Sequence, residues 1–506
     1  MRVIDVLASG DAGRVKLLET LERPYGQYVA LSYVWGKKHS MRLVRTNWND
    51  FMRGIALEEL PKTLQDAVRV TRSLDVQYLW IDSLCILQDS DFDKEMQIPY
   101  MNEYYRGAIA VISASGAADV HAGFLQPQET ESSVLARAES QIVAYDREHG
   151  PIPHRIPFSF PEETQLSLLT VDTKPRLYNY DEEPINKRGW TLQESALARR
   201  LLTFPSTGGI VMRCHDGEKL AGEILSNPFH EGPAFAYPEA QDRSQRSEAE
   251  LFQRWAETVQ DYSRRSLSQP SDILVALGAL ALESHIRDGA VLGRYVAGLW
   301  TNTLLKGLLW HSSQPPHPDR ESFLPPCRTV SQYHAPSWSW ASCGQPVIFR
   351  TEREPDLSLW TSKKEEPSWC MEILHCKVFP RSERNLFGAV ETGYVDIKGF
   401  LIPIQRVSKD GGSKPDKCNV EDVALVTGNG YKLVKSDIFA PDSVDSLALI
   451  NSLCYWLPLY NATRDRYRGL IIREIIPGRF CRLGFAEFAI FLSPLEQAEE
   501  QIIRLN

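Results

Sequence analysis

The sequence predicts an α/β fold, because short apolar runs alternate with stretches of helical periodicity. Residues 28–36 (YVALSYVWG) and 76–87 (VQYLWIDSLCIL) are rich in Val, Leu, Ile and Tyr, and each is expected to form a buried strand. Between them, residues 60–74 repeat apolar side chains at intervals of three and four, as an amphipathic helix does. This order is typical of a parallel sheet with crossover helices.

The same alternation continues downstream, where a second helix is expected over 93–106 and a third strand over 108–115. The resulting β-α-β-α-β order predicts a doubly wound sheet with helices on both of its faces. Ligands of such sheets bind outside the carboxyl ends of the strands. The sequence therefore directs attention to the residues that follow each predicted strand.

The rest of the chain predicts a helical layer followed by a mostly antiparallel β portion. Residues 126–187 are polar and are expected to be an excursion from the sheet. Helices are expected over 188–204, 248–265, 271–284 and 295–311, with a strand at 208–215 and β-like runs after 336. We expect four regions, namely an extension packed on the core (1–27), an α/β domain (28–205), a mainly helical region (206–335) and a β-rich region (336–506).

Composition excludes several classes of protein. The net charge of −9 argues against general binding of nucleic acid, which needs clustered Lys and Arg. No stretch approaches 18 uninterrupted apolar residues and no signal peptide is evident, so we expect a cytoplasmic protein without a membrane span. The nine cysteines never occur as CxxC, and neither a disulfide framework nor a metal site is indicated.

Polar groups follow the second predicted strand at short intervals. Asp82, Cys85, Gln88 and Asp89 come directly after an apolar run, and a buried carboxylate or amide is costly unless it is paired. Cys85 would need a neighbouring His to act as a nucleophile, and a buried, inert thiol is the favoured interpretation. These groups either bind a ligand at the end of the strand or connect the loops there.

A series of motifs resembles the fungal heterokaryon incompatibility (HET) domain family. The motifs occur in family order and cover nearly the whole chain: ALSYVWG, LPKTLQDAV, YLWIDSLCILQD, YYRGAIAVISAS, RGWTLQE, LLTF and PSWSWAS. The resemblance places a HET domain at 28–205 and implies a fungal intracellular protein linked to allorecognition and programmed cell death. It implies no required cofactor, and self-association or a separate incompatibility protein as the partner.

HET domains are distantly similar to Toll/interleukin-1 receptor (TIR) domains, and this implies a TIR-like or flavodoxin-like parallel sheet. Enzymatic TIR domains carry a catalytic glutamate four residues after a tryptophan, and WTLQE places Glu194 four residues after Trp190. These two residues would share one face of a helix. A carboxylate there could stabilise an oxocarbenium-like transition state during cleavage of the N-glycosidic bond of NAD.

Under this enzymatic interpretation the candidate catalytic residues are Glu194, Asp82 and Cys85. The candidate ligand-binding residues are Ser32, Tyr33, Trp35, Gly36, Gln88, Arg188 and Trp190. Each also has a structural interpretation: a surface or capping carboxylate for Glu194, a turn cap for Asp82, and a core aromatic followed by a glycine turn for Trp35 and Gly36. Trp338 and Trp340, at period two, are expected to point to one side of a strand and to pack between domains.

The sequence also departs from the family pattern. The block after Gln88 commonly reads Asp-Trp with a Glu four residues beyond the Asp, whereas here Asp93 is followed by Lys94 and by Gln97 at the glutamate position. If that glutamate belongs to a site, the site is altered. Three functions thus stay open: a cell-death effector, an NAD or nucleotide glycohydrolase, and a tailoring enzyme of fungal secondary metabolism.

Overall fold

The computed structural model divides into two compact units, each described below by itself. The first unit comprises Met1–Lys187 and Ala198–Glu231, and the second comprises Arg188–Leu197 and Gly232–Asn506. The structure describes residues 1–7, 12–20, 26–36, 41–125, 144–146, 150–152, 154–158, 167–171, 180–206, 210–214, 217–220, 246–313, 333–343, 345–350, 368–406, 423–425, 436–441, 454–463, 466–489 and 498–506.

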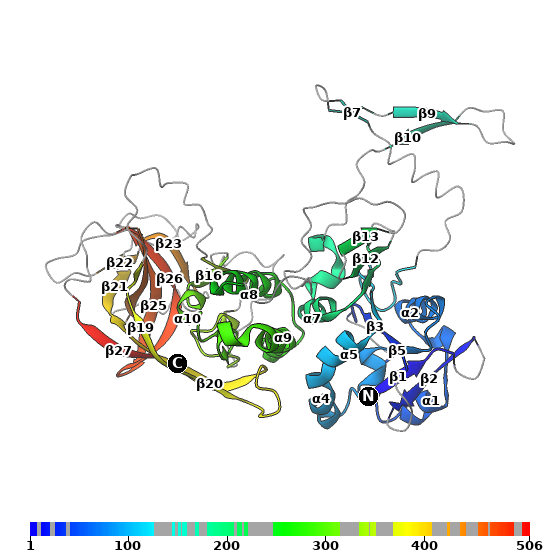
Figure 1. Ribbon diagram of the computed structural model, residues 1–506, viewed down its shortest axis with the longest axis horizontal. Coiled ribbons are helices and arrows are strands. Elements are labelled where there is room, and N and C mark those ends of the chain that lie inside the picture. Colours follow the sequence, from blue (N-terminus) through cyan, green and yellow to red (C-terminus); the bar gives the residue numbers. More distant parts are fainter. Residues whose placement is uncertain are drawn as a thin grey trace, which may run out of the picture. The chain divides into compact units, whose positions relative to one another are not determined.

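A nine-stranded sheet forms the framework of the first unit (Figure 1), in the order β13-β12-β11-β6-β3-β5-β1-β2-β4. Its central strands β11 (Leu201–Thr203), β6 (Ala110–Ser113), β3 (Tyr28–Ser32) and β5 (Tyr78–Trp80) are parallel. Counted along the chain, these four strands have the spatial order 2-1-3-4, as in flavodoxin-like sheets. The predicted α/β class is therefore confirmed.

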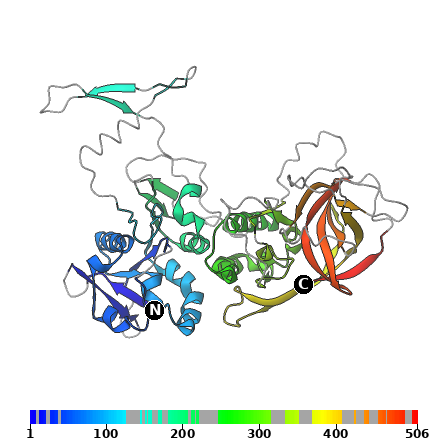
Figure 2. The ribbon, with the colours of Figure 1, turned by 180° about the vertical axis from the view of Figure 1, so that it is seen from behind.

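Helices cover both faces of this parallel core. Helix α2 (Lys62–Ser73) connects β3 to β5, and helices α4 (Asp91–Gln97) and α5 (Met101–Gly107) connect β5 to β6. The first connection moves one way along the sheet and the second moves back across β3, so right-handed crossovers place them on opposite faces. Figures 1 and 2 show α2 on one side of the strands and α5 on the other.

Antiparallel strands extend the parallel core at both edges. On one side β1 pairs with β5 and with β2, and β2 pairs with β4; on the other, β12 pairs with β11 and with β13. The remaining bounds in this unit are β1 (Arg2–Asp5), β2 (Arg14–Glu19), α1 (Trp48–Arg53), β4 (Ile55–Ala56), β12 (Val211–Cys214) and β13 (Gly217–Leu220). The described part of 126–187 adds two separate hairpins, β7 (Ala144–Asp146) with β8 (Gly150–Ile152) and β9 (His154–Phe158) with β10 (Ser167–Val171).

Two predicted elements end earlier than the sequence suggests. The strand expected over 76–87 stops at Trp80, because Asp82–Cys85 folds into one helical turn, α3. The helix expected over 188–204 ends at Leu197 in α7 (Gly189–Leu197), and 201–203 is the strand β11. Apolar periodicity alone does not distinguish a short buried strand from the last turn of a helix. Residues 201–203 form a strand because they pair with β6.

In the second unit, α7 is followed by the two predicted helices α8 (Glu248–Ser263) and α9 (Val275–Leu292), of which α9 continues past its expected end at residue 284. The third helix expected at 295–311 was wrong. The chain instead forms the hairpin β14 (Tyr295–Val296) and β15 (Leu299–Trp300), the short helix α10 (Leu304–Gly307) and the strand β16 (Trp310–Ser312). Ala297 and Gly298, which connect β14 to β15, have φ of +47° and +93°, as a tight hairpin turn requires.

Two tryptophans hold this turn from outside. The indole N–H groups of Trp255 and Trp340 both donate to the Gly298 carbonyl, at 2.8 and 2.9 Å, and Ser339 Oγ donates to Ala297 O. Trp338 and Trp340 are buried in the core of this unit. Trp340–Ser342 is a 3₁₀ turn rather than the expected strand, because Ser339 caps it through the amide of Ala341.

A ten-stranded sheet completes the second unit and confirms the mostly antiparallel C-terminal portion. All its strand pairs are antiparallel except β26 with β27. The strands are β18 (Ser368–Trp369), β19 (Glu372–Pro380), β20 (Val390–Phe400), β21 (Ile402–Arg406), β22 (Val423–Leu425), β23 (Ser436–Pro441), β24 (Cys454–Thr463), β25 (Arg466–Ile476), β26 (Arg479–Ala489) and β27 (Glu500–Leu505), and β17 (Val347–Phe349) pairs with β16 outside the sheet.

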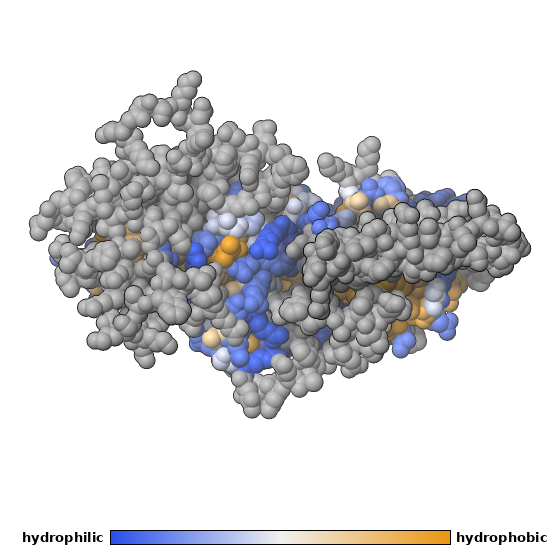
Figure 3. Space-filling view, turned by 90° about the horizontal axis from the view of Figure 1, so that it is seen from above, coloured by the Kyte–Doolittle hydropathy of each residue, from blue (hydrophilic) through white to orange (hydrophobic). Residues whose placement is uncertain are grey.

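The coloured surface in Figure 3 is mostly hydrophilic, with hydrophobic residues visible in smaller areas. Across the described ranges, every helix is too short or too polar to span a bilayer.

Replacing Gly298 with Ala should destabilise the second unit strongly. Its backbone has positive φ, and an added Cβ would lie 2.5 Å from the Trp340 indole nitrogen. Gly478→Ala is the matched control, because φ is also positive there but nothing lies within 4 Å. Urea unfolding should give a loss of about 1 kcal/mol for the control and about 2–3 kcal/mol for Gly298→Ala. Equal losses would contradict the packing described here.

Candidate functional site

Three hydroxyl side chains lie in register at the carboxyl ends of neighbouring parallel strands. Ser32 ends β3, Ser113 ends β6 and Thr203 ends β11, and the backbone pairs Ser32 with Ser113 and Ser113 with Thr203. All three residues are buried. The chain crosses from β5 back to β6 around β3, so the β3–β6 boundary is the point of the sheet where ligands of flavodoxin-like folds bind.

Beside this row, the loop after β3 contacts the turn after β5. Trp35 Nε1 donates to Asp82 Oδ2 at 2.9 Å and to Oδ1 at 3.2 Å, and the amide of Ser83 donates to Asp82 Oδ1 at 2.6 Å. Tyr33 donates its buried hydroxyl to Ser83 Oγ at 2.7 Å. Tyr33, Trp35 and Asp82 thus form one polar group at the carboxyl edge, with Trp35 and Asp82 half-exposed.

Gly36 allows a third loop to approach this group. Its φ is +78°, and an added Cβ would lie 2.5 Å from Cβ of Asp119, in the loop that follows β6. The Asp119 carboxylate accepts the amides of His121 and Ala122, at 2.8 and 3.1 Å. Only glycine satisfies both the backbone conformation and the close contact, so the expected glycine turn is present.

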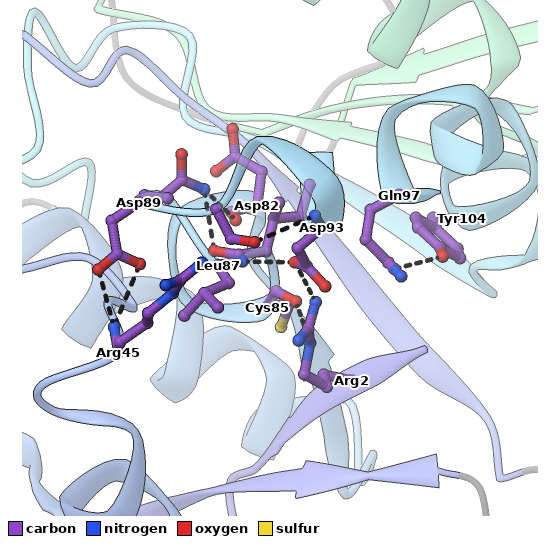
Figure 4. A network of polar contacts seen from close by, with 12 residues as sticks. Arg2, Arg45, Asp82, Cys85, Leu87, Asp89, Asp93, Gln97 and Tyr104 are labelled. Carbon is purple, nitrogen blue, oxygen red and sulfur yellow. Dashed lines mark hydrogen bonds and ion pairs between the residues drawn. The ribbon is translucent and has the colours of Figure 1, made fainter. Parts of the chain in front are cut away.

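Most polar groups of the turn after β5 connect loops. Gln88 Nε2 donates to the carbonyls of Asp82 and Ile86, at 3.2 and 3.0 Å, within its own turn. The Asp89 carboxylate accepts the amide of Arg45 through both oxygens at 3.1 Å (Figure 4). Gln88 and Asp89 therefore have a structural role, whereas Asp82 presents its carboxylate toward the loop after β3.

Asp93 joins this turn to the first strand. Its carboxylate accepts the amide of Leu87 at 2.8 Å and forms an ion pair with Arg2, which also donates to the Cys85 carbonyl at 2.7 Å. Farther along, Gln97 Oε1 accepts the hydroxyl of Tyr104 at 2.7 Å. Figure 4 shows Asp93 between Arg2 and Leu87, and the Gln97–Tyr104 pair as a separate contact. Glutamine therefore makes a defined contact at the position where the family commonly has glutamate.

Cys85 is poorly suited to nucleophilic catalysis. It is 1% exposed, and burial raises the pKa of its thiol to about 12. Its sulfur accepts a contact from the Ile81 amide at 3.5 Å. At neutral pH the thiol is almost entirely protonated, and only the thiolate is strongly nucleophilic.

The remaining candidates belong to the second unit. Glu194 is 5% exposed, on α7, which packs mainly against α9 and also against α8. The Trp190 side chain donates to Asp272, whose pKa is raised because burial outweighs that hydrogen bond. The Arg188 carbonyl accepts Thr191 Oγ1 at 2.9 Å. The helix that carries the tryptophan-glutamate pair is thus an integral part of the helical layer, while Asp82 and Trp35 belong to the first unit.

Sequence reasoning missed a buried carboxylate in the first unit. Glu183 is 1% exposed and accepts three donors, namely Ser115 Oγ at 3.1 Å, Ser206 Oγ at 2.9 Å and the Ser206 amide. It connects the chain after β6 to the chain after β11. Its sequence surroundings are polar and show no periodicity, so only the serines at the strand ends could have indicated a partner.

The fold and this edge define an α/β protein with a flavodoxin-like core and a carboxylate-aromatic group beside the point where the strand order reverses. A search of the described residues for three or more His, Cys, Asp or Glu side chains placed to hold a metal ion finds none.

Comparisons with known proteins agree with the motifs. Residues 28–194 match the family model described as Heterokaryon incompatibility protein (HET). It is 35% identical over 104 residues to "Heterokaryon incompatibility protein 6, OR allele" of Neurospora crassa. That match covers 19% of this chain and only 15% of the relative's length. No solved structure matches the chain.

Removing the Arg2 guanidinium should destabilise the first unit. Arg2→Met leaves the largely buried Asp93 carboxylate without its ion-pair partner, which should cost about 3 kcal/mol in urea unfolding. Arg53→Met is the control, because the Arg53–Asp50 pair is exposed and its loss should cost less than about 1 kcal/mol. Similar losses in the two variants would refute a structural role for Arg2.

Cys85 should resist alkylation in the folded protein. With a thiol pKa of about 12, roughly one thiol in 10⁴ is ionised at pH 8. Peptide mapping after iodoacetamide treatment should find Cys85 unmodified under native conditions and modified in urea. Rapid native modification would restore it as a candidate nucleophile.

Proposed function

We propose that this chain is an effector of heterokaryon incompatibility, acting in programmed cell death after fusion of unlike fungal cells. The match of residues 28–194 to the HET family model carries this proposal. The incompatibility protein of N. crassa supports it over the shared 104 residues. In this proposal the HET domain transmits the signal by contacting another protein or a second copy of itself.

The carboxyl edge of the first unit supports a second candidate function, namely binding of a nucleotide or a related small molecule. Trp35 offers an aromatic ring and Asp82 a carboxylate beside the β3–β6 boundary, and Gly36 allows close backbone approach. An aromatic face can stack on a base, and a carboxylate can accept ribose hydroxyls. Cleavage of the N-glycosidic bond of NAD, with Glu194 on α7 as the catalytic carboxylate, is a separate enzymatic proposal that rests on the WTLQE spacing and not on this edge.

Expression in a fungal host tests the effector function. Induced expression of the full chain should reduce colony viability at least tenfold. The variant Asp82→Asn should lose at least half of this effect if the carboxyl edge takes part, because it weakens the contact that positions Trp35. Asp50→Asn, at an exposed position of the same unit, is the control. Unchanged viability on expression of a folded, abundant protein would contradict the effector function.

Purified protein tests the second candidate. NAD incubated with the full chain should release nicotinamide, and Glu194→Gln and Asp82→Asn should each lower the rate at least 100-fold if these carboxylates act in the reaction. Far-UV circular dichroism confirms that each variant is folded. Absence of turnover in the unmodified protein would end the NAD-cleaving proposal and leave the effector function standing.

A further inference from the structure

Helix α4 and the 3₁₀ turn after it, η4 (Ile98–Tyr100), contain no buried residue although they carry large apolar side chains. Phe92 is 73% exposed and Tyr100 is 47% exposed. Met96, half-buried, lies four residues from each of them, a spacing that brings successive side chains near one another along a helix. Exposed apolar side chains gathered on one short segment are a feature of interaction sites.

The segment is rigidly attached despite its exposure. Ser90 caps α4 by accepting the amide of Asp93 at 3.3 Å, and the Asp93 carboxylate binds Arg2 and the Leu87 amide. At the other end, Gln97 is bonded to Tyr104. These contacts, of which Figure 4 shows those of Asp93 and Gln97, hold the backbone of α4 in place, and Phe92 and Tyr100 belong to this fixed segment.

Exposed charges of opposite sign lie on α4 and on a loop attached to the turn before it. Asp91 and Glu95 are exposed on α4, and the ion pair of Asp91 with Lys94 is long, at 3.7 Å. Arg42 and Arg45 are exposed on the loop that precedes α1, and the Asp89 carboxylate attaches this loop, through the Arg45 amide, to the turn before α4. The surface is therefore acidic on the helix and basic on the adjoining loop.

We propose that this surface, defined as residues 91–100 together with Arg42 and Arg45 and named the α4 face, docks a second copy of the same chain. In a two-fold pair each surface meets itself in reversed orientation. The acidic helix of one copy then meets the basic loop of the other, around an apolar centre formed by Phe92 and Tyr100. This inference deepens the proposed function, since it rests on self-association as the means of signalling.

Charge complementarity selects this partner. With a net charge of −9, two copies repel each other in most orientations. Two copies attract each other only where the acidic part of one surface meets the basic part of the other, which a surface with both signs allows. The contact is accordingly expected to weaken as salt increases, because exposed charges are screened.

Sedimentation velocity of the full chain over a range of concentrations tests the α4 face. The unmodified protein should form dimers, and Phe92→Ser should raise the dissociation constant at least tenfold, the size of effect expected for an aromatic at the centre of an interface. Ile286→Ser, which changes an exposed apolar residue of the second unit, should leave it unchanged. A protein that stays monomeric, or a dimer unaffected by Phe92→Ser, overturns the proposal.

Charge reversal gives a second test that does not depend on the core of the contact. Glu95→Arg and Arg45→Glu should each abolish dimers, because like charges then meet twice in the two-fold pair. An equimolar mixture of the two variants should form mixed dimers, since each reversed charge meets its opposite. Failure of the mixture to associate, when both variants are folded, excludes this surface.

The two proposals fail in distinguishable ways. If dimers form as described but expression of the chain leaves viability unchanged, the effector function fails and the α4 face stands. If expression lowers viability while the purified chain stays monomeric at every concentration, the α4 face fails and the effector acts through a different protein.

Discussion

The ion pair between Arg2 and Asp93 determines how the first unit presents its functional surface. Arg2 begins β1, which pairs with β5, and Asp93 lies on α4, the second helix after β5. The pair and its bonds to the Cys85 carbonyl and the Leu87 amide fix the course of the chain where it leaves the sheet. Both the Asp82–Trp35 group and the α4 face depend on this course. Because an unpaired buried charge is costly, arrangements of the chain that separate Arg2 from Asp93 are disfavoured.

The polar residues of the turn after β5 divide into two groups, those that connect loops and one that faces a candidate ligand site. The polar groups of this turn must be paired because they adjoin the core, and Gln88 and Asp89 are used in this way. Asp82 differs, because its carboxylate meets an indole from another loop and stays half-exposed. Cys85, three residues farther along the same helical turn, is excluded from water, and its thiol stays protonated. Burial and pairing thus separate the residue suited to ligand binding from its structural neighbours.

In the second unit, the central constraint is the Ala297–Gly298 turn. This unit also contains α7, in which the match to the HET family model ends. Two indoles and a serine converge on the Ala297–Gly298 turn, which joins the hairpin to the segment that carries Trp340. The family match ends at residue 194. The last residues of the matched region therefore pack within the second unit: α7 packs on α9, and Arg265 donates to Thr191.

Local pattern alone determined the α/β class, the parallel strands, the helices at 60–74 and 248–265, and the resemblance of residues 28–194 to the HET family model, since apolar periodicity and motif order are properties of the sequence. Tertiary structure decided the rest. Residues 295–311 have a helical pattern, but positive φ at Ala297 and Gly298 and the indole contacts make 295–300 a hairpin. The partners of Asp82, Asp93 and Glu183 lie 47, 91 and 23–68 residues away in the chain. Such contacts form only when the sheet brings strand ends together, and no local pattern encodes them.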